Sequence, residues 1–194
     1  MSLFRNHIDD FRRTEAYIRP DQERVAEFRR RLAALPGRRK VGISWRSGKL
    51  NAERNSSYTS LSDWEAVLRL PDVDFINLQY GDCAEELANA RDHFGVTIHQ
   101  WEDLDLKDDL DGVFALAHCL DHVVSVTTAP SVMAVAVGTP TSVLMPRSSW
   151  TLFGTDEYLI FPRLTPYICD HGEPLRDHIP RMASGVQASL DAGA

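Results

Sequence analysis

The fold is decided by Ser125-Val126-Thr127-Thr128-Ala129-Pro130-Ser131-Val132-Met133-Ala134-Val135-Ala136-Val137-Gly138-Thr139-Pro140. This stretch predicts a buried strand that ends at Val126, a turn at the two threonines, and then a helix. Pro130 suits the first turn of a helix, because its fixed φ and missing N–H cost nothing there. The small side chains of Ala134 and Ala136 allow that helix to approach a sheet closely.

The start of this predicted helix has the features of a phosphate-binding site. Its first N–H groups have no partner inside the helix, and the positive end of the helix dipole points the same way. Backbone N–H groups with threonine hydroxyls can therefore hold a diphosphate. A simpler interpretation stays open, since threonine is also an ordinary helix cap. The residues expected at the site are Thr127, Thr128, Ala129 and Ser131.

Outward from this stretch, short β-rich runs alternate with amphipathic ones, which predicts an α/β fold with a Rossmann-like parallel sheet and helices on both faces. Right-handed crossovers bring the carboxyl ends of all the strands to one edge, where a site is expected. The strands are predicted at 41–45, 73–80, 96–100, 122–126 and 141–145, and the helices at 21–35, 62–70, 84–94, 109–120, 131–137 and 180–190. The segment after Pro146 is predicted to be rich in loops until the last helix.

Length and charge narrow the function further. The 194 residues, 43% of them hydrophobic, fit a helical extension at 1–38 and one Rossmann-like domain at 39–194. The formal charge of −7 and the scattered basic residues argue against nucleic acid as a partner. No apolar run approaches the roughly 20 residues of a membrane helix. Three cysteines without a paired pattern and a start without a signal peptide predict a cytoplasmic protein.

From about Tyr17 to about Tyr167, the chain resembles GT-B glycosyltransferases. It is most similar to bacterial tetratricopeptide-repeat glycosyltransferases, which are related to O-linked N-acetylglucosamine transferase, and to the lipopolysaccharide heptosyltransferases. Their segment reads Ser-Val-Asp-Thr-Ala-x-x-His-Leu-Ala-Gly-Ala-Leu-Gly-x-Pro, and this chain has Thr127 in place of Asp and Val132 in place of His. The matching positions are Ser125, Val126, Thr128, Ala129, Ala134, Ala136, Gly138 and Pro140.

The resemblance implies that the chain is one half of a GT-B fold, the C-terminal domain that binds the donor. Val41-Gly42-Ile43-Ser44-Trp45-Arg46 is similar to the first strand of that domain, whose loop brings a basic side chain to the phosphates. Arg46, Lys49 and Arg54 are the candidates, and such a cation stabilises the leaving diphosphate without a metal ion. Exposed arginines in a polar loop can also be merely solvated.

A third similar segment ends in Gln79-Tyr80-Gly81 and continues into an acidic helix start. In the heptosyltransferases, Gly-x-x-x-Glu offers a carboxylate to the ribose, and Gly81 with Glu85 has that spacing. The alternative is that Glu85 only complements the helix dipole. Gln79 and Tyr80 complete the candidate donor-binding residues.

The sequence lacks the motifs that a kinase, a nicotinamide dehydrogenase or a hydrolase requires. The sequence contains no P-loop, no Gly-x-Gly-x-x-Gly and no Gly-x-Ser-x-Gly. The acidic run from Glu102 to Asp111 lacks the glycine and the closing glutamate of a calcium loop, and it predicts a solvated loop with an aspartate cap for the next helix. Cys169, His171 and His178 do not have the spacing of metal ligands, so neither a metal nor a cofactor is expected.

The sequence therefore predicts a glycosyltransferase-like domain that binds the diphosphate of a nucleotide-sugar substrate. No catalytic residue can be chosen, because in the related enzymes the base comes largely from an N-terminal domain. Thr127 and Val132 favour an alternative, a non-catalytic or split nucleotide-binding module that works with a partner chain. The expected partners are a nucleotide-sugar, and either a separate acceptor-binding protein or further copies of this chain.

Overall fold

The computed structural model describes residues 15–47 and 59–193. The order of elements is α1 (Gln22–Ala33), β1 (Arg39–Ser44), η3 (Leu61–Trp64), α2 (Glu65–Leu68), β2 (Val73–Asn77), α3 (Ala84–Phe94), β3 (Ile98–His99), α4 (Leu110–His118), β4 (His122–Val126), α5 (Ala129–Ala136), β5 (Thr141–Pro146), η4 (Trp150–Leu152), β6 (Leu164–Cys169), η5 (Leu175–His178) and α6 (Ile179–Ala192).

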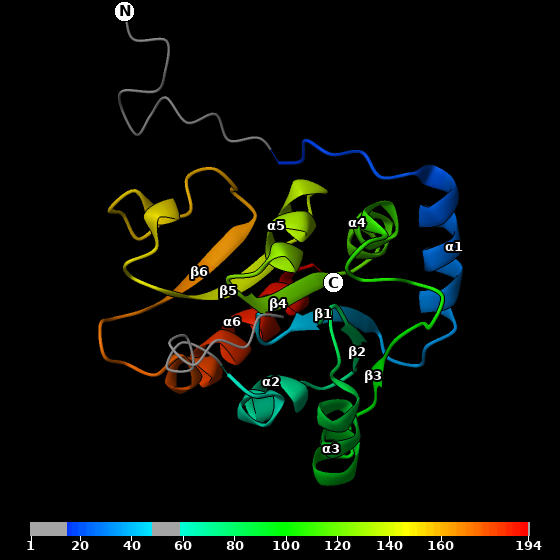
Figure 1. Cartoon of the computed structure of the whole chain (residues 1–194), viewed down its shortest axis with the longest axis horizontal. Helices are drawn as coiled ribbons and strands as arrows, with labels where there is room; N and C mark the ends of the chain where they lie inside the picture. The colour runs from blue at the N-terminus through cyan, green and yellow to red at the C-terminus, as the bar shows by residue number, and fades with distance from the viewer. Residues whose placement is uncertain (1–14, 48–58, 194) are drawn as a thin grey trace, which may run out of the picture.

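The strands form one parallel sheet in the order β3-β2-β1-β4-β5-β6. Figure 1 shows α1, α4 and α5 over one face of the sheet and α2, α3 and α6 over the other. The predicted α/β fold, with a parallel sheet and helices on both faces, is therefore confirmed. Chain order reverses between β1 and β4, the position at which open α/β sheets bind ligands.

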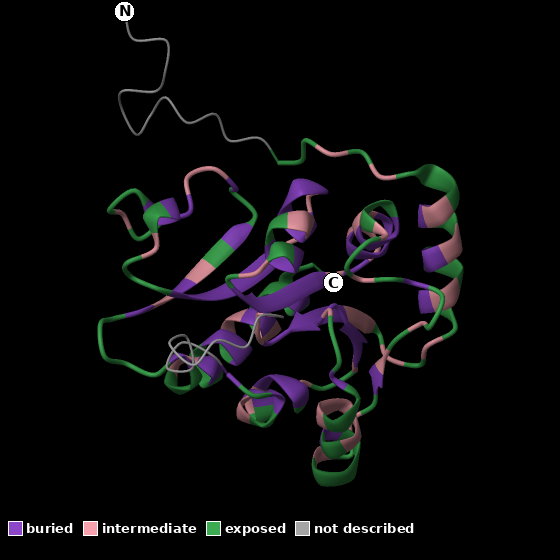
Figure 2. Cartoon of the chain, viewed as in Figure 1, coloured by how far each residue is buried: buried purple, intermediate pink, exposed green. Residues whose placement is uncertain are grey.

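The core lies on both sides of the sheet, because its central strands are buried on both faces (Figure 2). On one face, Val41, Phe75 and Val124 pack with α2, α3 and α6. On the other, Ile76 and Val123 pack with α1, α4 and α5. A third cluster fills the space between α5, β5 and the β5–β6 connection, as shown by Val135, Val143, Leu152, Tyr158 and Phe161.

The N-terminal helix α1 lies on the domain, as expected. Val25, Phe28 and Leu32 are buried against α4. Arg24 donates to Asp109, with 2.8 Å between Nη1 and Oδ1, and Arg31 donates to Asp103 at a similar distance. The core of α1 is thus continuous with that of the sheet.

Most predicted elements are confirmed within a few residues, and two segments differ. The helix predicted at 62–70 is a 3₁₀ turn followed by the single turn of α2. The loop-rich prediction after Pro146 was wrong in part, because Leu164–Cys169 forms β6. Pro166 conceals this strand in the sequence, since proline is usually absent from strands, but β6 is the last strand of the sheet and an edge tolerates it.

Among the described residues, no helix is long and apolar enough to cross a membrane. The same residues contain no group of three or more His, Cys, Asp or Glu side chains placed to hold a metal ion.

Candidate functional site

The centre of the site is the point where β1 and β4 end side by side. Ser44 and Ser125 are partners in the register of these strands, and both are completely buried. The chain then diverges, from β1 into Trp45 and Arg46 and from β4 into the turn before α5. The first turn of α5 therefore lies where the strand order reverses, the position at which open α/β sheets bind ligands.

Thr128 occupies the N-cap position of α5, but its side chain makes no capping hydrogen bond. Its Oγ1 lies 3.0 Å from Oγ of Ser125 and 3.5 Å from Oγ of Ser44, so the hydroxyl is turned toward the two serines. Among the residues that the structure describes, no side chain caps the first N–H groups of α5. The interpretation of Thr128 as an ordinary side-chain cap does not agree with this geometry.

The other residues predicted around this turn have different environments. Thr127 and Ala129 are exposed, and Oγ1 of Thr127 donates to the carbonyl of Leu144 at 3.4 Å. Ser131 is buried, and its hydroxyl donates to the carbonyl of Thr128 at 2.7 Å. Val132, which stands in place of the histidine of the resembling family, is 39% exposed. The turn thus presents backbone and hydroxyl groups but no ionisable side chain.

Gln79 ties the end of β2 to the end of β1. Its buried Oε1 accepts from the backbone N–H groups of Trp45 and Arg46, at 3.2 and 3.0 Å, and its Nε2 donates to the carbonyl of Tyr80. Oγ of Ser44 also lies 3.4 Å from this Oε1. Gln79 therefore holds the loop after β1 in place.

The charge of Arg46 is already paired in this structure. Its Nε and Nη2 donate to Oε2 of Glu86 at 2.9 and 2.6 Å, and Nη2 also donates to the carbonyl of Asp82. The indole N–H of Trp45 donates to the other oxygen of Glu86. Only 13% of the Arg46 side chain is exposed, so a phosphate has to compete with Glu86 for it.

Two kinds of predicted residue remain, one exposed and the others not described. Glu85 is exposed in the first turn of α3, next to Glu86. Lys49 and Arg54 lie outside the described residues. The donor-binding roles of all ten candidate residues stay predictions.

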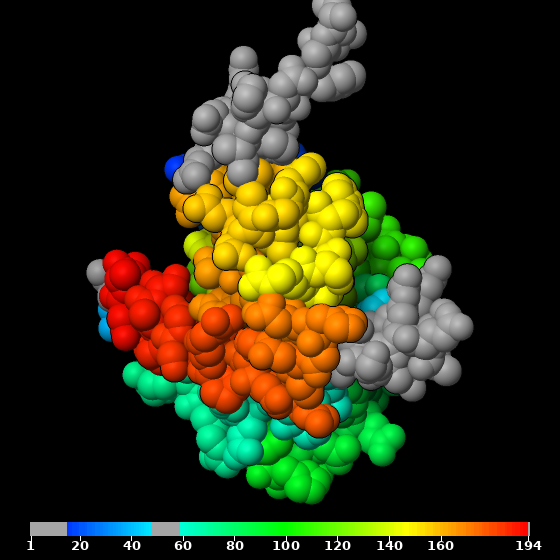
Figure 3. Space-filling view, turned by 90° about the vertical axis from the view of Figure 1, so that its left-hand side faces the viewer, coloured from blue at the N-terminus to red at the C-terminus, as the bar shows by residue number. Residues whose placement is uncertain are grey.

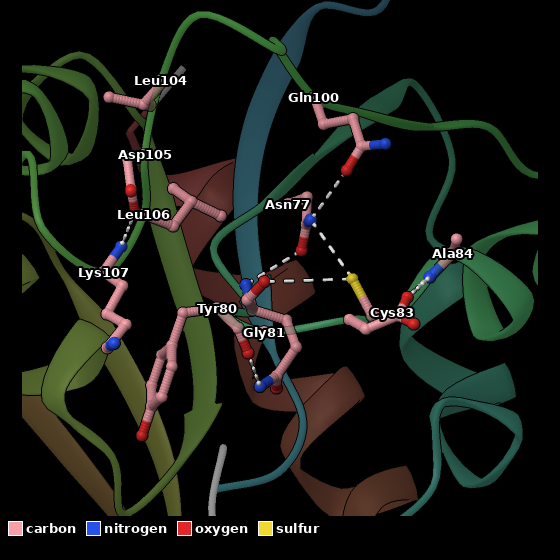
Figure 4. Close-up of a pocket in the computed structure, with 12 residues that line it drawn as sticks. Asn77, Tyr80, Gly81, Cys83, Ala84, Gln100, Leu104, Asp105, Leu106 and Lys107 are labelled. Atoms are coloured by element: carbon pink, nitrogen blue, oxygen red, sulfur yellow. Dashed lines mark hydrogen bonds between the residues drawn. The ribbon is translucent and has the colours of Figure 1, made fainter.

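A cavity of about 290 Å³ adjoins these residues at the ends of β2 and β3. Figure 4 shows Tyr80 on the same side of it as Lys107, and Asn77, Gln100 and Cys83 grouped opposite. Nδ2 of Asn77 donates to Oε1 of Gln100 at 3.1 Å, and Oδ1 of Asn77 accepts from the N–H of Gln79 at 2.8 Å. Gln79 thus connects the wall of the cavity to the three hydroxyl groups near the start of α5, those of Ser44, Ser125 and Thr128.

The segment that closes the cavity comes from the acidic run 102–111. Asp105 accepts from the N–H groups of Lys107 and Asp108, at 2.8 and 3.1 Å, and these bonds lower the pKa of its carboxyl. Asp109 caps α4 through the N–H of Gly112, which confirms the predicted aspartate cap. On the opposite wall, burial raises the pKa of the Cys83 thiol, which keeps it protonated at neutral pH.

Sequence reasoning missed Asn77, Gln100 and Lys107 as lining residues. The sequence around Asn77 predicts a strand and gives no sign of a site. Lys107 is the single basic residue of the acidic run, so the run predicts a solvated loop. The position of Asn77 and Gln100 could have indicated their role, because both lie at or just beyond the carboxyl end of a strand.

The sheet order, the helices on both faces and the open edge between β1 and β4 define a Rossmann-like domain of the kind found in GT-B glycosyltransferases. Among solved structures, the chain is similar to the ADP-heptose lipopolysaccharide heptosyltransferase II of Escherichia coli, with a TM-score of 0.64 and 13% identity over 91% of this chain. It is also similar to a glycosyltransferase family 9 protein of Veillonella parvula, with a TM-score of 0.56 and 12% identity over 91% of this chain. The E. coli heptosyltransferase WaaC with ADP gives a TM-score of 0.52 and 18% identity over 88% of this chain.

This chain covers 54%, 54% and 48% of those three structures, respectively. Among curated proteins, it is 44% identical over 177 residues to Protein FlbA of Caulobacter vibrioides, which is 91% of this chain and 30% of FlbA. No protein-family model matches. The likeness to solved structures establishes the fold, and the relation to tetratricopeptide-repeat enzymes stays a prediction.

Proposed function

We propose that this chain is a glycosyltransferase-like domain that binds the diphosphate of a nucleotide-sugar donor at the first turn of α5. The observation that carries the proposal is the orientation of Thr128, which leaves the N-terminus of α5 uncapped at the point where the strand order reverses. An anion placed there meets N–H groups that no side chain in the described part of the chain caps, together with the positive end of the helix dipole.

The neighbouring cavity supports the same proposal. Gln79 lines it and also holds the loop after β1, and we infer that a ligand with phosphates at α5 extends from there toward Tyr80 and Asn77. Polar amides beside the aliphatic side chains of Leu104 and Leu106 suit a nucleoside, which has both polar edges and an apolar face. The proposal includes three further expectations: Glu85 binds the ribose, transfer proceeds without a metal ion, and the protein is cytoplasmic.

A second candidate is a nucleotide-binding module that does not catalyse transfer alone. Two observations favour it: Thr127 in the turn before α5 and Val132 within α5 stand in place of ionisable side chains, and Arg46 is paired with Glu86. Such a module requires catalytic groups from a partner chain.

A nucleotide screen tests the proposed site. Thermal shift and saturation-transfer NMR with UDP, GDP, ADP and CMP are expected to show stabilisation and contact with at least one of them, because a ligand that binds only the folded state stabilises it. If none of the four stabilises the chain or receives saturation, the donor-binding proposal is wrong.

A turnover assay then separates the two candidates. Release of nucleoside diphosphate from UDP-, GDP- and ADP-sugars is expected from the chain alone if it is an enzyme. If nucleotide binds but no diphosphate is released without a partner protein, the second candidate is the correct one.

A further inference from the structure

The segment between β3 and α4, residues 101–109, forms one wall of the cavity and contains no helix or strand. The residues of this segment that line the cavity are Leu104, Asp105, Leu106 and Lys107. Bonds within the segment close its turns, because Asp105 accepts from two of its N–H groups and the N–H of Asp109 donates to the carbonyl of Asp105 at 3.0 Å. These bonds shape the segment but do not fix its position on the domain, so other contacts must hold it.

Two arginines of α1 hold this segment near its two ends. Arg31 donates to Asp103 through two nitrogens, with 2.8 Å from Nη1 to Oδ1 and 2.6 Å from Nη2 to Oδ2. Arg24 pairs with Asp109 in the same two-point way, with 2.8 Å from Nη1 to Oδ1. Two parallel hydrogen bonds fix the orientation of the groups as well as their distance. The residues that line the cavity lie between these two anchored positions.

Apolar contacts with α1 support the same segment. The ring of Phe28 meets the ring of Trp101 edge to face, with 5.9 Å between the centroids and 64° between the planes. Leu104 is buried and belongs to the apolar cluster that contains Val25, Phe28 and Leu32 of α1. Because Leu104 also lines the cavity, this side chain joins the core under α1 to the cavity wall.

The residues just before α1 contact the other part of the proposed site. The N–H groups of Tyr17 and Ile18 both donate to the carbonyl of Ala136, the last residue of α5, at 3.0 Å. Figure 1 shows α1 beside the segment between β3 and α4, on the side of the sheet opposite β6. The β6 side, with the β5–β6 connection, faces the viewer in Figure 3 (yellow to orange). Residues 17–33 therefore contact both α5 and the segment that forms the cavity wall.

The exposure of the ion pair between Arg31 and Asp103 indicates a local role. The two side chains are 25% and 63% exposed, and exposed ion pairs contribute little to the stability of a whole domain. Hydrogen bonds from Arg31 lower the pKa of the Asp103 carboxyl, so the pair stays charged at neutral pH. A charged two-point contact on a segment without helix or strand restricts the local opening of that segment.

We propose that α1 positions the cavity wall for the nucleoside of the donor, with Arg31 and Arg24 as positioning residues that act through Asp103 and Asp109. A wall that is ordered before the ligand arrives spares the free energy that ordering it on binding would cost. The inference rests on the proposed function, because it takes the nucleoside to occupy this cavity. It gives the helical extension predicted from the sequence a part in ligand affinity.

A charge reversal at Arg31 tests the proposal in a titration with whichever of UDP, GDP, ADP and CMP stabilises the wild type most. Arg31→Glu brings a like charge to Asp103 and Glu27 and is expected to weaken nucleotide binding about fivefold. Arg30→Glu is the matched control, because it makes the same charge change in the same last turn of α1. Arg30 is exposed and forms no ion pair within the described part of the chain, so this variant is expected to bind like the wild type.

Restoring the ion pair with reversed charges separates positioning from a purely structural effect. Arg31→Glu combined with Asp103→Arg is expected to recover most of the lost affinity. Hydrogen exchange gives a readout that needs no ligand, because the N–H groups of Lys107 and Asp108 donate to Asp105 within the segment. Both N–H groups are expected to exchange faster in Arg31→Glu than in Arg30→Glu.

Three results would overturn the proposal: equal affinity of Arg31→Glu and Arg30→Glu, no recovery in the double variant, or equal exchange of the two N–H groups in both single variants. If the wild type binds no nucleotide, the proposed function is wrong and this inference falls with it. The two failures are distinguishable, since failure of the proposed function appears in the wild type, whereas failure of this inference appears only in the variants.

Discussion

A single side-chain orientation decides what the first turn of α5 can do. Had Thr128 capped the helix, its oxygen would occupy the N–H groups that an anion needs. Its hydroxyl instead lies 3.0 Å from Ser125. Ser125 and Ser44, the two serines near this hydroxyl, are buried at the ends of β4 and β1. The geometry of the turn therefore depends on the register of these strands.

Gln79 has a similar positioning role, because it is the acceptor for two backbone N–H groups of the loop after β1. Gln79→Leu leaves both donors without that acceptor, and we expect the free energy of unfolding to fall by about 3 kcal/mol. Urea denaturation measures this change. Gln22→Leu, on the exposed start of α1, is the control with an expected change below about 0.5 kcal/mol. Equal effects of the two substitutions would contradict the positioning role.

His122 makes the stability of the protein depend on pH. It is buried at the start of β4, its Nε2 lies 3.0 Å from Oγ of Ser142, and its Nδ1 has no hydrogen-bond partner among residues 15–47 and 59–193. Burial lowers its pKa from 6.5 to about 4, against the opposing effect of Asp121. The unfolded chain therefore binds a proton more readily than the folded one, and stability falls as the pH drops from about 6.5 toward 4.

The loss from this group amounts to about 3 kcal/mol over that range. His122→Gln, which does not titrate, is expected to show a correspondingly smaller loss between pH 7 and pH 4. Urea denaturation at both pH values measures the difference. The same pH dependence in the variant and the wild type would assign the effect to the carboxylates instead.

At the scale of elements, sequence patterns predict helices and strands with a regular hydrophobic period. They miss elements whose structure depends on neighbouring segments of the fold. The run 122–126 and the helix Ala84–Phe94 match their predictions at both ends, because hydrophobic pattern and flanking residues agree. β6 was missed, since only its place at the edge of the sheet makes Pro166 acceptable. The candidate site shows the same limit. The sequence predicts Arg46 as a phosphate ligand, but only the fold shows that α3 places Glu86 in contact with it.

The packing of α6 on β6 depends on Gly185. A Cβ at this position would lie 1.9 Å from Oη of Tyr167, so one of the two must shift. We expect Gly185→Ala to destabilise the protein by about 1 kcal/mol, because overpacking outweighs the better helix propensity of alanine.

A double-mutant cycle isolates the cause. Tyr167→Phe removes Oη, so Gly185→Ala in that background is expected to be neutral or stabilising, with a coupling energy of about 1 kcal/mol or more. Thermal or urea unfolding of the four proteins measures it. Additive effects would show that the tyrosine hydroxyl is not what excludes a larger residue.

At the scale of the whole molecule, the described residues form one α/β unit with two linked features at the carboxyl edge of its sheet. The uncapped start of α5 and the cavity at the ends of β2 and β3 are linked through Ser44 and Gln79, and Thr127 links the turn before α5 to Leu144 of β5. The chain spans about half of the solved structures it resembles and 30% of FlbA. Composition and periodicity predicted this unit, whereas the contacts among its loops required the fold.

The most direct test of diphosphate binding at α5 is a titration of three proteins with the nucleotide that stabilises the wild type most. Thr128→Val removes the hydroxyl that holds the turn before α5 to Ser125, and Thr165→Val makes the same change on the exposed part of β6. At a ligand concentration of 100 times the dissociation constant, wild type and Thr165→Val are expected to gain about 2.7 kcal/mol of stability, and Thr128→Val clearly less. Equal stabilisation of all three proteins would place the phosphates elsewhere, and stabilisation of none would contradict nucleotide binding altogether.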